Sequence, residues 1–247
     1  MSAITTSQPS KVQTVVIDTI NEIISQQVIK QWKDKGKANF DDWRDYGVDM
    51  FSLVNYLKTL PNCIPISILG YESTGKTVGA ASLNPDTTIY LNCDNKPLSF
   101  IGGRIKYSKE KKNYFIPKTY DEIENIINSI YKNKMNTEPF FVFVLAHIES
   151  YKSGDGSLKE RMRIPGKVAH KYNIDGSFIH TYYTTIENDG KDYNDSSKYQ
   201  LITANSEGTN TARSPMGLWD SLTIPNNYQL IIDNILEKEY GIMPKSK

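Results

Sequence analysis

The sequence predicts an α/β protein in which a mostly parallel sheet lies between helices, a three-layer arrangement with an antiparallel hairpin extension. Two observations support this prediction. Short apolar, β-branched runs alternate along the first 150 residues with amphipathic segments at helical spacing. After them, two strand-like segments flank a polar turn, which is typical of a hairpin added to the edge of such a sheet.

The composition limits the function classes. The 247 residues carry 29 basic and 28 acidic side chains, so the formal net charge of +1 excludes wholesale electrostatic capture of DNA or membrane. No apolar run approaches the roughly 20 residues of a membrane helix, and the first residues do not resemble a secretory signal. The two cysteines, Cys63 and Cys93, cannot form a disulfide framework. We therefore expect a cytoplasmic protein without a membrane partner.

The chain is predicted to form one domain over residues 12–247, preceded by a flexible N-terminus over residues 1–11. Within the domain we expect three parts. Residues 12–61 provide a carboxylate-bearing strand with helices, residues 62–150 a nucleotide-binding core, and residues 151–247 a basic loop, a hairpin and a C-terminal helix.

The elements follow from their spacing. Buried strands are expected over residues 12–17, 64–69, 88–92 and 140–146, the last at the centre of the sheet because it is the most apolar. Helices are expected over residues 20–33, 41–60, 78–83, 120–131 and 227–240. Thr119, with Glu122 three residues later, is predicted to cap the helix over residues 120–131. A polar loop over residues 149–166 and hairpin strands over residues 178–186 and 199–204 complete the prediction.

One segment indicates chemistry. Residues 70–77, GYESTGKT, match the phosphate-binding pattern GxxxxGK[ST], and a predicted strand precedes it as the mechanism requires. The loop N–H groups and the N-terminus of the following helix would bind phosphates, Lys76 would reach the β- and γ-phosphates, and Thr77 would ligate Mg²⁺. We predict ATP and Mg²⁺ as cofactors. The expected contacts are Gly70, Tyr71, Glu72, Ser73, Thr74, Gly75, Lys76, Thr77 and Val78.

Hydrolysis also needs a carboxylate at the end of a strand to hold the metal. The best apolar strand followed by Asp is VVID at residues 15–18, which lies upstream of the phosphate loop. We predict that Asp18 is this carboxylate, although a helix N-cap is an equally good interpretation from sequence alone. Asp94 is the alternative metal carboxylate.

Two further residues follow the central strand. His147 ends it, at the place where a polar side chain can sense the γ-phosphate, although a hydrogen-bonded structural histidine is the alternative. Glu149 is predicted to orient water or metal, or else to be a solvated carboxylate. Asp94, Glu72 and Glu149 are the candidates for a general base.

Basic side chains lie in the predicted polar loop and beyond the hairpin. A mobile basic loop could follow a phosphodiester backbone, or it could be an ordinary solvated loop. Arg213 could act as an arginine finger on the nucleotide of a neighbouring subunit, with a surface ion pair as the alternative. The candidate nucleic-acid contacts are Lys152, Lys159, Arg161, Arg163 and Lys167.

Several segments together resemble one family. They are ILGYESTGKT (68–77), SLNPDTTIYLNCDNKPLSF (82–100), FVFVLAHIES (141–150), PGKVAHKYNIDGSFIHTYYT (165–184) and NTARSPMGLWDSLTIPNNYQLIIDNI (210–235). They resemble bacteriophage RecA-like, AAA-family P-loop ATP-binding proteins associated with recombination and single-strand annealing. The resemblance implies a RecA-like core, ATP binding by residues 70–77, a polar strand-end residue at His147 and a basic residue at Arg213. It also implies the cytoplasm of a host cell as the location.

The chain departs from this family in the order of its parts. The family places the carboxylate strand and two helices before the segment that resembles residues 141–150, whereas here only residues 132–139 are available there. The N-terminal segment of residues 12–61 has the features that are missing there, namely an apolar strand that ends in Asp and helices that follow it. We therefore predict a transposed topology in which the Asp18 strand precedes the phosphate loop.

The leading hypothesis is a homo-oligomeric ATPase of DNA recombination or replication, with single-stranded DNA and a single-strand-binding or recombination protein as partners. A nucleotide-gated interaction module that binds ATP without hydrolysing it is the alternative. A P-loop kinase acting on a small molecule is a weaker third hypothesis, because we see no arginine-rich lid.

Overall fold

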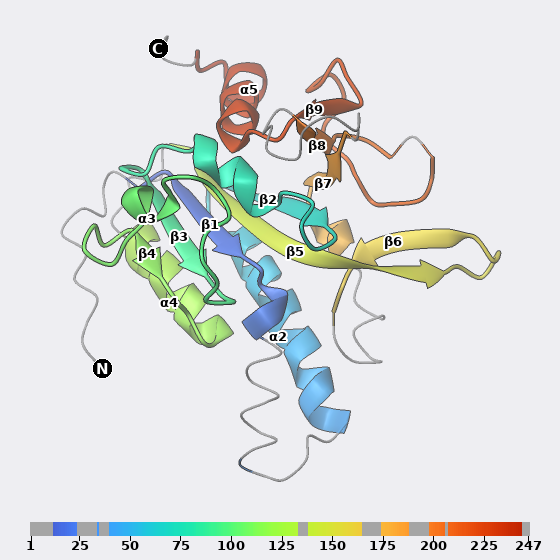
Figure 1. The fold of residues 1–247 in the computed structure, drawn as a ribbon, viewed down its shortest axis with the longest axis horizontal. Helices are drawn as coiled ribbons and strands as arrows, with labels where there is room; N and C mark the ends of the chain where they lie inside the picture. The colour runs from blue at the N-terminus through green and yellow to red at the C-terminus, as the bar shows by residue number, and fades with distance from the viewer. Residues whose placement is uncertain are drawn as a thin grey trace.

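The computed structural model describes residues 12–23, 34, 40–132, 138–164, 174–187, 198–205 and 207–243, and for residues 40–47 the backbone alone. Its strands are β1 (Thr14–Asp18), β2 (Cys63–Gly70), β3 (Thr88–Asn92), β4 (Tyr114–Phe115), β5 (Phe140–Lys152), β6 (Leu158–Met162), β7 (His180–Ile186), β8 (Tyr199–Ile202) and β9 (Thr223–Pro225). They form a nine-stranded sheet in the order β4-β3-β1-β5-β2-β7-β8-β9, with β6 paired to β5 outside this path (Figure 1).

The sheet is parallel from β4 to β7 and antiparallel from β7 to β9. The predicted α/β class, the mostly parallel sheet and the hairpin extension of β7 and β8 are therefore confirmed. As predicted, β5 lies in the interior of the sheet, between β1 and β2. Its first seven residues are buried, which explains the uninterrupted apolar run.

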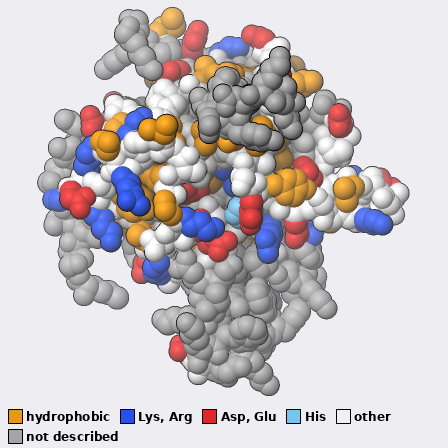
Figure 2. Space-filling model, in the orientation of Figure 1, with side chains coloured by type: hydrophobic (Ala, Val, Ile, Leu, Met, Phe, Trp, Pro, Cys, Tyr) orange, Lys and Arg blue, Asp and Glu red, His pale blue; other side chains and the backbone are white. Residues whose placement is uncertain are grey.

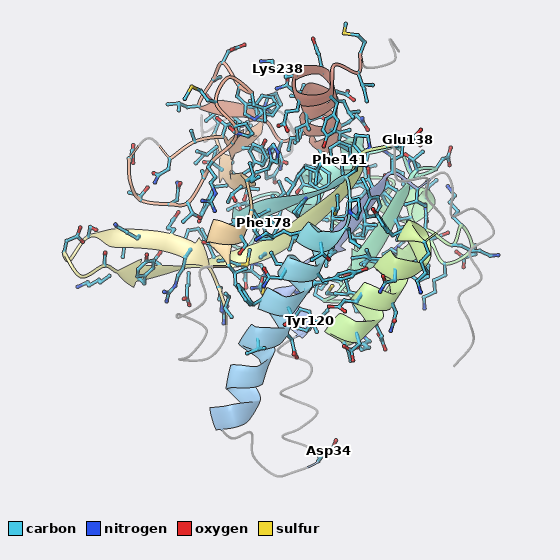
Figure 3. All side chains as sticks on the ribbon, turned by 180° about the vertical axis from the view of Figure 1, so that it is seen from behind. Asp34, Tyr120, Glu138, Phe141, Phe178 and Lys238 are labelled. Atoms are coloured by element: carbon cyan, nitrogen blue, oxygen red, sulfur yellow. The ribbon has the colours of Figure 1, made fainter. Side chains whose placement is uncertain are left out.

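Helices cover both faces of the sheet. On one face, α2 (Phe40–Thr59) and α4 (Tyr120–Tyr131) lie side by side, as Figure 3 shows from behind. Leu53, Val54 and Ile127 pack there against the strand residues Val142 and Val144. On the other face, α5 (Tyr228–Tyr240) and the 3-10 helix η2 (Thr77–Ser82) pack against the alternate strand residues. The two faces therefore bury separate clusters, and β1, β2 and β5 each contribute apolar side chains to both.

Helix ends follow the capping chemistry expected from the sequence. The Thr119 side chain accepts a hydrogen bond from the Glu122 amide at the start of α4. The Asn227 side chain caps α5 in the same way, and Gly241 ends α5 with φ +67°. A short helix α3 (Gly103–Lys106) lies between β3 and β4.

The prediction of a polar loop over residues 149–166 is wrong. β5 continues to Lys152 and pairs with β6 in an antiparallel ribbon, which we call the β-arm (residues 148–162). Figure 1 shows the β-arm extending away from the body of the molecule. Because both of its faces carry polar side chains, the sequence lacks the hydrophobic alternation that identifies a half-buried strand.

The helix expected after the phosphate loop is also different. Residues Thr77–Ser82 form a 3-10 helix of six residues, too short to supply the dipole of an α-helix. Gly79 lies close beneath α5, since a Cβ there would come within 2.3 Å of both the Asn226 Oδ1 atom and the Tyr228 ring. Close packing of small residues therefore replaces a regular helix.

Some predictions fall outside the described residues. These are the flexible N-terminus over residues 1–11, the helix over residues 20–33 beyond Ile23, and the hairpin turn over residues 188–197. Within the described part of the chain, no helix combines the length and apolar character needed to cross a membrane.

Candidate nucleotide site

The carboxyl ends of β1 and β2 lie beside the middle of β5. The prediction that His147 ends the central strand is wrong, because β5 continues past it to Lys152 and pairs there with β6. β2 ends at Gly70, which is the register partner of His147 in β5. β1 ends at Asp18, which is the register partner of Asn92 in β3. Because the strands are parallel and adjacent, the phosphate loop, Asp18 and His147 lie together although they are far apart in sequence.

The phosphate loop adopts a conformation that needs its glycines. Gly75 has φ +90°, and Ser73 has φ +63°. A Cβ on Gly70 would lie 1.9 Å from the Thr184 Oγ1 atom, and a Cβ on Gly75 would lie 2.3 Å from the Tyr199 ring. Side chains of β7 and β8 therefore pack directly against the loop backbone.

The Lys76 side chain is enclosed by its own loop. Its ammonium group donates to the backbone oxygens of Gly70 at 2.9 Å and Tyr71 at 2.6 Å, and it lies 3.2 Å from His147 Nδ1. Burial lowers the pKa of Lys76 to about 8, although the negative charges of Asp18 and Glu72 partly oppose this. A cation held at the centre of the loop is positioned to meet phosphate oxygens.

Asp18 lies beside Thr77. The Thr77 hydroxyl donates to Asp18 Oδ2 at 3.1 Å, the Thr19 hydroxyl donates to Oδ1 at 3.0 Å, and the Tyr90 hydroxyl also donates to Oδ2. The two residues predicted to ligate Mg²⁺ thus lie within hydrogen-bond distance of each other, and their role as metal ligands stays a prediction. These donors are all hydroxyl groups, whereas an N-cap would accept from backbone N–H groups. Burial raises the pKa of Asp18, and the Tyr90 hydrogen bond partly lowers it.

His147 faces Lys76 as a neutral imidazole. Burial, together with the nearby Lys76 ammonium group, lowers the pKa of His147 to about 4. Its Nδ1 atom can therefore accept a hydrogen bond from Lys76. Its backbone N–H donates to Asn21 Oδ1 at 2.7 Å, which fixes the strand against the segment after β1.

The candidate general bases differ in their surroundings. The Glu149 carboxylate binds Arg161, whose Nε and Nη2 atoms both lie 2.9 Å from Glu149 Oε1, so the structure places Glu149 in an ion pair on the β-arm. Asp94 lies 3.4 Å from the Lys96 ammonium group and contributes to the raised pKa of Asp18. Glu72 is exposed and acts electrostatically on Lys76. Asp94 and Glu72 are thus the better-placed candidates.

A tyrosine of the phosphate loop contacts the β-arm. The Tyr71 hydroxyl donates to Glu160 Oε1 at 3.0 Å and also contacts the Ser150 hydroxyl. The backbone oxygen of the same tyrosine accepts from Lys76. One residue therefore joins the loop cation to the β-arm.

The basic residues predicted to bind nucleic acid lie on the β-arm rather than in a loop. Lys159 and Arg161 share one face of the ribbon, where Arg161 covers the Tyr151 ring with its Cζ atom 4.3 Å from the ring centroid. Lys152 belongs to the other face, because strand neighbours alternate. Arg163 follows β6, and Lys167 lies outside the described residues.

Arg213 is bound within its own chain. Its Nε atom donates to the Phe178 backbone oxygen at 2.7 Å, and an Nη atom donates to the Asp175 backbone oxygen. Its backbone pairs with Thr181 of β7. The guanidinium group therefore braces the 3-10 turn η4 (Asp175–Ser177), and the arginine-finger role stays a prediction.

Sequence patterns missed the residues that support the loop from a distance. The Asn226 amide donates to the Gly75 backbone oxygen at 2.7 Å, and the Tyr228 hydroxyl donates to that of Lys76. Tyr90 was expected only as part of the strand over residues 88–92, and its hydrogen bond to Asp18 was not predicted. No sequence spacing relates Asn226 to the loop, because it follows Gly75 by 151 positions.

Comparisons with family models, with curated proteins and with solved structures give no match to this chain. The described residues also contain no group of three or more His, Cys, Asp or Glu side chains arranged around a metal position. Interpretation of the site therefore depends on its own geometry.

Proposed function

We propose that this protein binds Mg-ATP in the loop of residues 70–77 and hydrolyses it. The observation that supports this best is the 3.1 Å contact between the Thr77 hydroxyl and the Asp18 carboxylate, next to Lys76 in a GxxxxGK[ST] loop. A loop hydroxyl and a strand-end carboxylate are the two side chains with which P-loop NTPases hold Mg²⁺. They come from segments 59 positions apart, so their meeting is a property of the fold.

The residues present fit the proposed cofactors. Gly70 and Gly75 let Thr184 and Tyr199 pack directly against the loop, which supports the compact loop conformation that would present backbone N–H groups to phosphate oxygens. The Thr77 hydroxyl and the Asp18 carboxylate offer the hard oxygen ligands that Mg²⁺ prefers. When bound, Mg²⁺ would neutralise charge on the phosphates.

The chain's own groups then have defined tasks. Lys76 would exchange its backbone acceptors for phosphate oxygens and balance their charge. His147, neutral and 3.2 Å from Lys76, would hold that ammonium group in position. Thr19 and Tyr90 would fix the Asp18 carboxylate by hydrogen bonds. A general base among Asp94 and Glu72 would take the proton from water.

We further propose a RecA-like fold and DNA recombination or replication as the setting, with single-stranded DNA bound by the β-arm. The arm carries Lys159 and Arg161 next to an aromatic side chain, and Tyr71 joins it to the phosphate loop. A homo-oligomer and a single-strand-binding partner belong to the same proposal.

The test is Mg²⁺-dependent ATP turnover of the full chain, with and without single-stranded DNA. Lys76→Ala should abolish turnover and weaken ATP binding at least 10-fold. Lys58→Ala, which removes an exposed lysine at the end of α2, is the matched control and should leave both unchanged. Turnover that persists in Lys76→Ala would contradict the proposal.

The alternative is a nucleotide-gated module that binds ATP without hydrolysis. The ion pair between Glu149 and Arg161 favours it, because this pairing occupies one of the three carboxylates considered as a base. Tight ATP binding with no turnover, with or without DNA, would select this alternative.

A further inference from the structure

A second cleft lies beside the candidate nucleotide site. Its volume is about 400 Å³, and the loops that follow β3 and surround α3 line it. This volume lies in the range of small-molecule sites in proteins. The lining begins at Asn95, three positions after Asn92, the register partner of Asp18. Part of the cleft lining therefore follows the carboxyl end of β3, next to the strand that ends at Asp18.

Three basic side chains line the cleft, namely Lys96, Arg104 and Lys109, against one carboxylate, Glu110. The Lys96 side chain is 69% exposed. The Asp94 carboxylate lies near its ammonium group and also accepts a hydrogen bond from the Lys96 backbone N–H. Among the described residues, Arg104 and Lys109 form no ion pair with a carboxylate, and both are exposed. Figure 2 shows Lys and Arg side chains interspersed with hydrophobic ones over the region of α3 and β4. The cleft thus has an excess of available positive charge.

Aromatic and apolar side chains form the rest of the wall. Tyr107, Tyr114 and Leu98 line the cleft together with the basic residues. The rings of Tyr90 and Tyr114 stack, with centroids 6.3 Å apart and planes 15° apart. The Tyr90 hydroxyl donates to Asp18, so the wall of the cleft is joined to the proposed metal carboxylate. Cations bind phosphate, and tyrosine rings and apolar surface accept a planar base.

We propose that this cleft binds a nucleoside phosphate unit, at a site separate from the ATP loop. Arg104 and Lys109 contact its phosphate, and the tyrosine wall accepts its base. The unit belongs either to a free nucleoside monophosphate or to a single strand of nucleic acid. Binding here does not require that the phosphate loop hold ATP.

The experiment compares two probes, dAMP by calorimetry and a fluorescein-labelled 12-nucleotide DNA strand by anisotropy. Both are measured with the full chain and with Lys76→Ala, which removes the contribution of the phosphate loop. Arg104→Ala/Lys109→Ala should weaken binding of the preferred probe at least 10-fold. It should also reduce the slope of log K against log salt concentration by the amount that corresponds to the loss of one or two phosphate contacts. Lys58→Ala should change neither quantity.

The outcomes are separable. A strand that binds at least 10-fold more tightly than dAMP identifies nucleic acid as the source of the unit. Comparable binding of dAMP identifies a free nucleotide. The proposal is overturned if neither probe binds to Lys76→Ala, or if the double variant binds as the parent does while Lys152→Ala/Lys159→Ala on the β-arm loses binding. ATP affinity of the double variant, measured separately, should be unchanged, so failure here is distinct from failure of the ATP site.

Discussion

The Nζ atom of Lys76 lies 3.2 Å from Nδ1 of His147, and the ammonium group has two backbone oxygens as its other acceptors. The histidine is half-buried and the lysine buried. A neutral imidazole is the form that can accept from an ammonium group, which agrees with the low pKa of His147. The position of the loop cation therefore depends on a residue of a neighbouring strand.

The first prediction concerns this pair. His147→Leu removes the acceptor, so we expect ATP turnover to fall about 10- to 100-fold. The dissociation constant for ATP should change by less than about threefold, because Lys76 keeps its charge. His147→Gln, which retains an acceptor, should be intermediate. Steady-state kinetics and equilibrium binding check this, and equal activity of all three proteins would exclude a role for the imidazole.

The second prediction concerns the metal carboxylate. Asp18→Asn keeps the size of the side chain but removes its charge, so Mg²⁺-dependent turnover should fall about 100-fold or more. ATP binding measured without Mg²⁺ should change little. Asp86→Asn, at an exposed position in the turn before β3, is the control and should be as active as the parent. Full activity of Asp18→Asn would require another metal ligand, with Asp94 the first to examine.

The third prediction concerns the shape of the phosphate loop. Gly75→Ala combines an unfavourable φ of +90° with a contact of 2.3 Å to the Tyr199 ring, so it should abolish ATP binding. Gly208→Ala has a similar φ of +70° but no atom within 4 Å of the new Cβ. It should cost about 1 kcal/mol of unfolding free energy and leave ATP binding intact. Urea unfolding and ATP titration separate the two effects; equal loss of ATP binding in both variants would contradict this explanation.

The fourth prediction concerns stability in acid. Burial lowers the pKa of His180 to about 4, although Glu239 lies 3.5 Å from its Nε2 atom. Between pH 6.5 and 4 the unfolded chain therefore binds a proton at this residue that the folded chain does not, and stability falls as the pH falls. Relative to His180→Gln, the parent should lose about 2 to 3 kcal/mol more between pH 7.5 and 4.5. Urea unfolding at both pH values tests this, and parallel losses would contradict it.

The sequence predicted those parts of the fold that depend on local patterns. The bounds of β3 and α4 agree with the prediction because one is a continuous buried run and the other is strongly amphipathic with a capping residue. The meeting of Asp18 and Thr77 was predictable because parallel strands end at one edge. The argument requires only that the two strands be parallel, because their carboxyl ends then lie at the same edge of the sheet whichever strand comes first in the chain.

The remaining features depend on contacts between distant segments. The β-arm has polar residues on both faces, so its strands lack a hydrophobic period. Tyr199 and Asn226 approach Gly75 from the hairpin and from the segment before α5, which no spacing in the sequence indicates. The second cleft is lined mainly by connecting loops, whose side chains are brought together by tertiary structure.

The placement of β1 also determines when the protein can fold during synthesis. This strand leaves the ribosome before the rest of the sheet, yet Val15 pairs with Ile89 on one side and with Val142 on the other. A nascent chain that ends before Phe140 leaves one edge of β1 unpaired, with a row of open backbone groups and apolar side chains. Such long-range parallel pairing is slow, so folding waits for β5 to emerge. Among the described strands, the one that brings the carboxylate to the phosphate loop is thus the first to be made, yet it gains its second partner only after more than 120 further residues have been added.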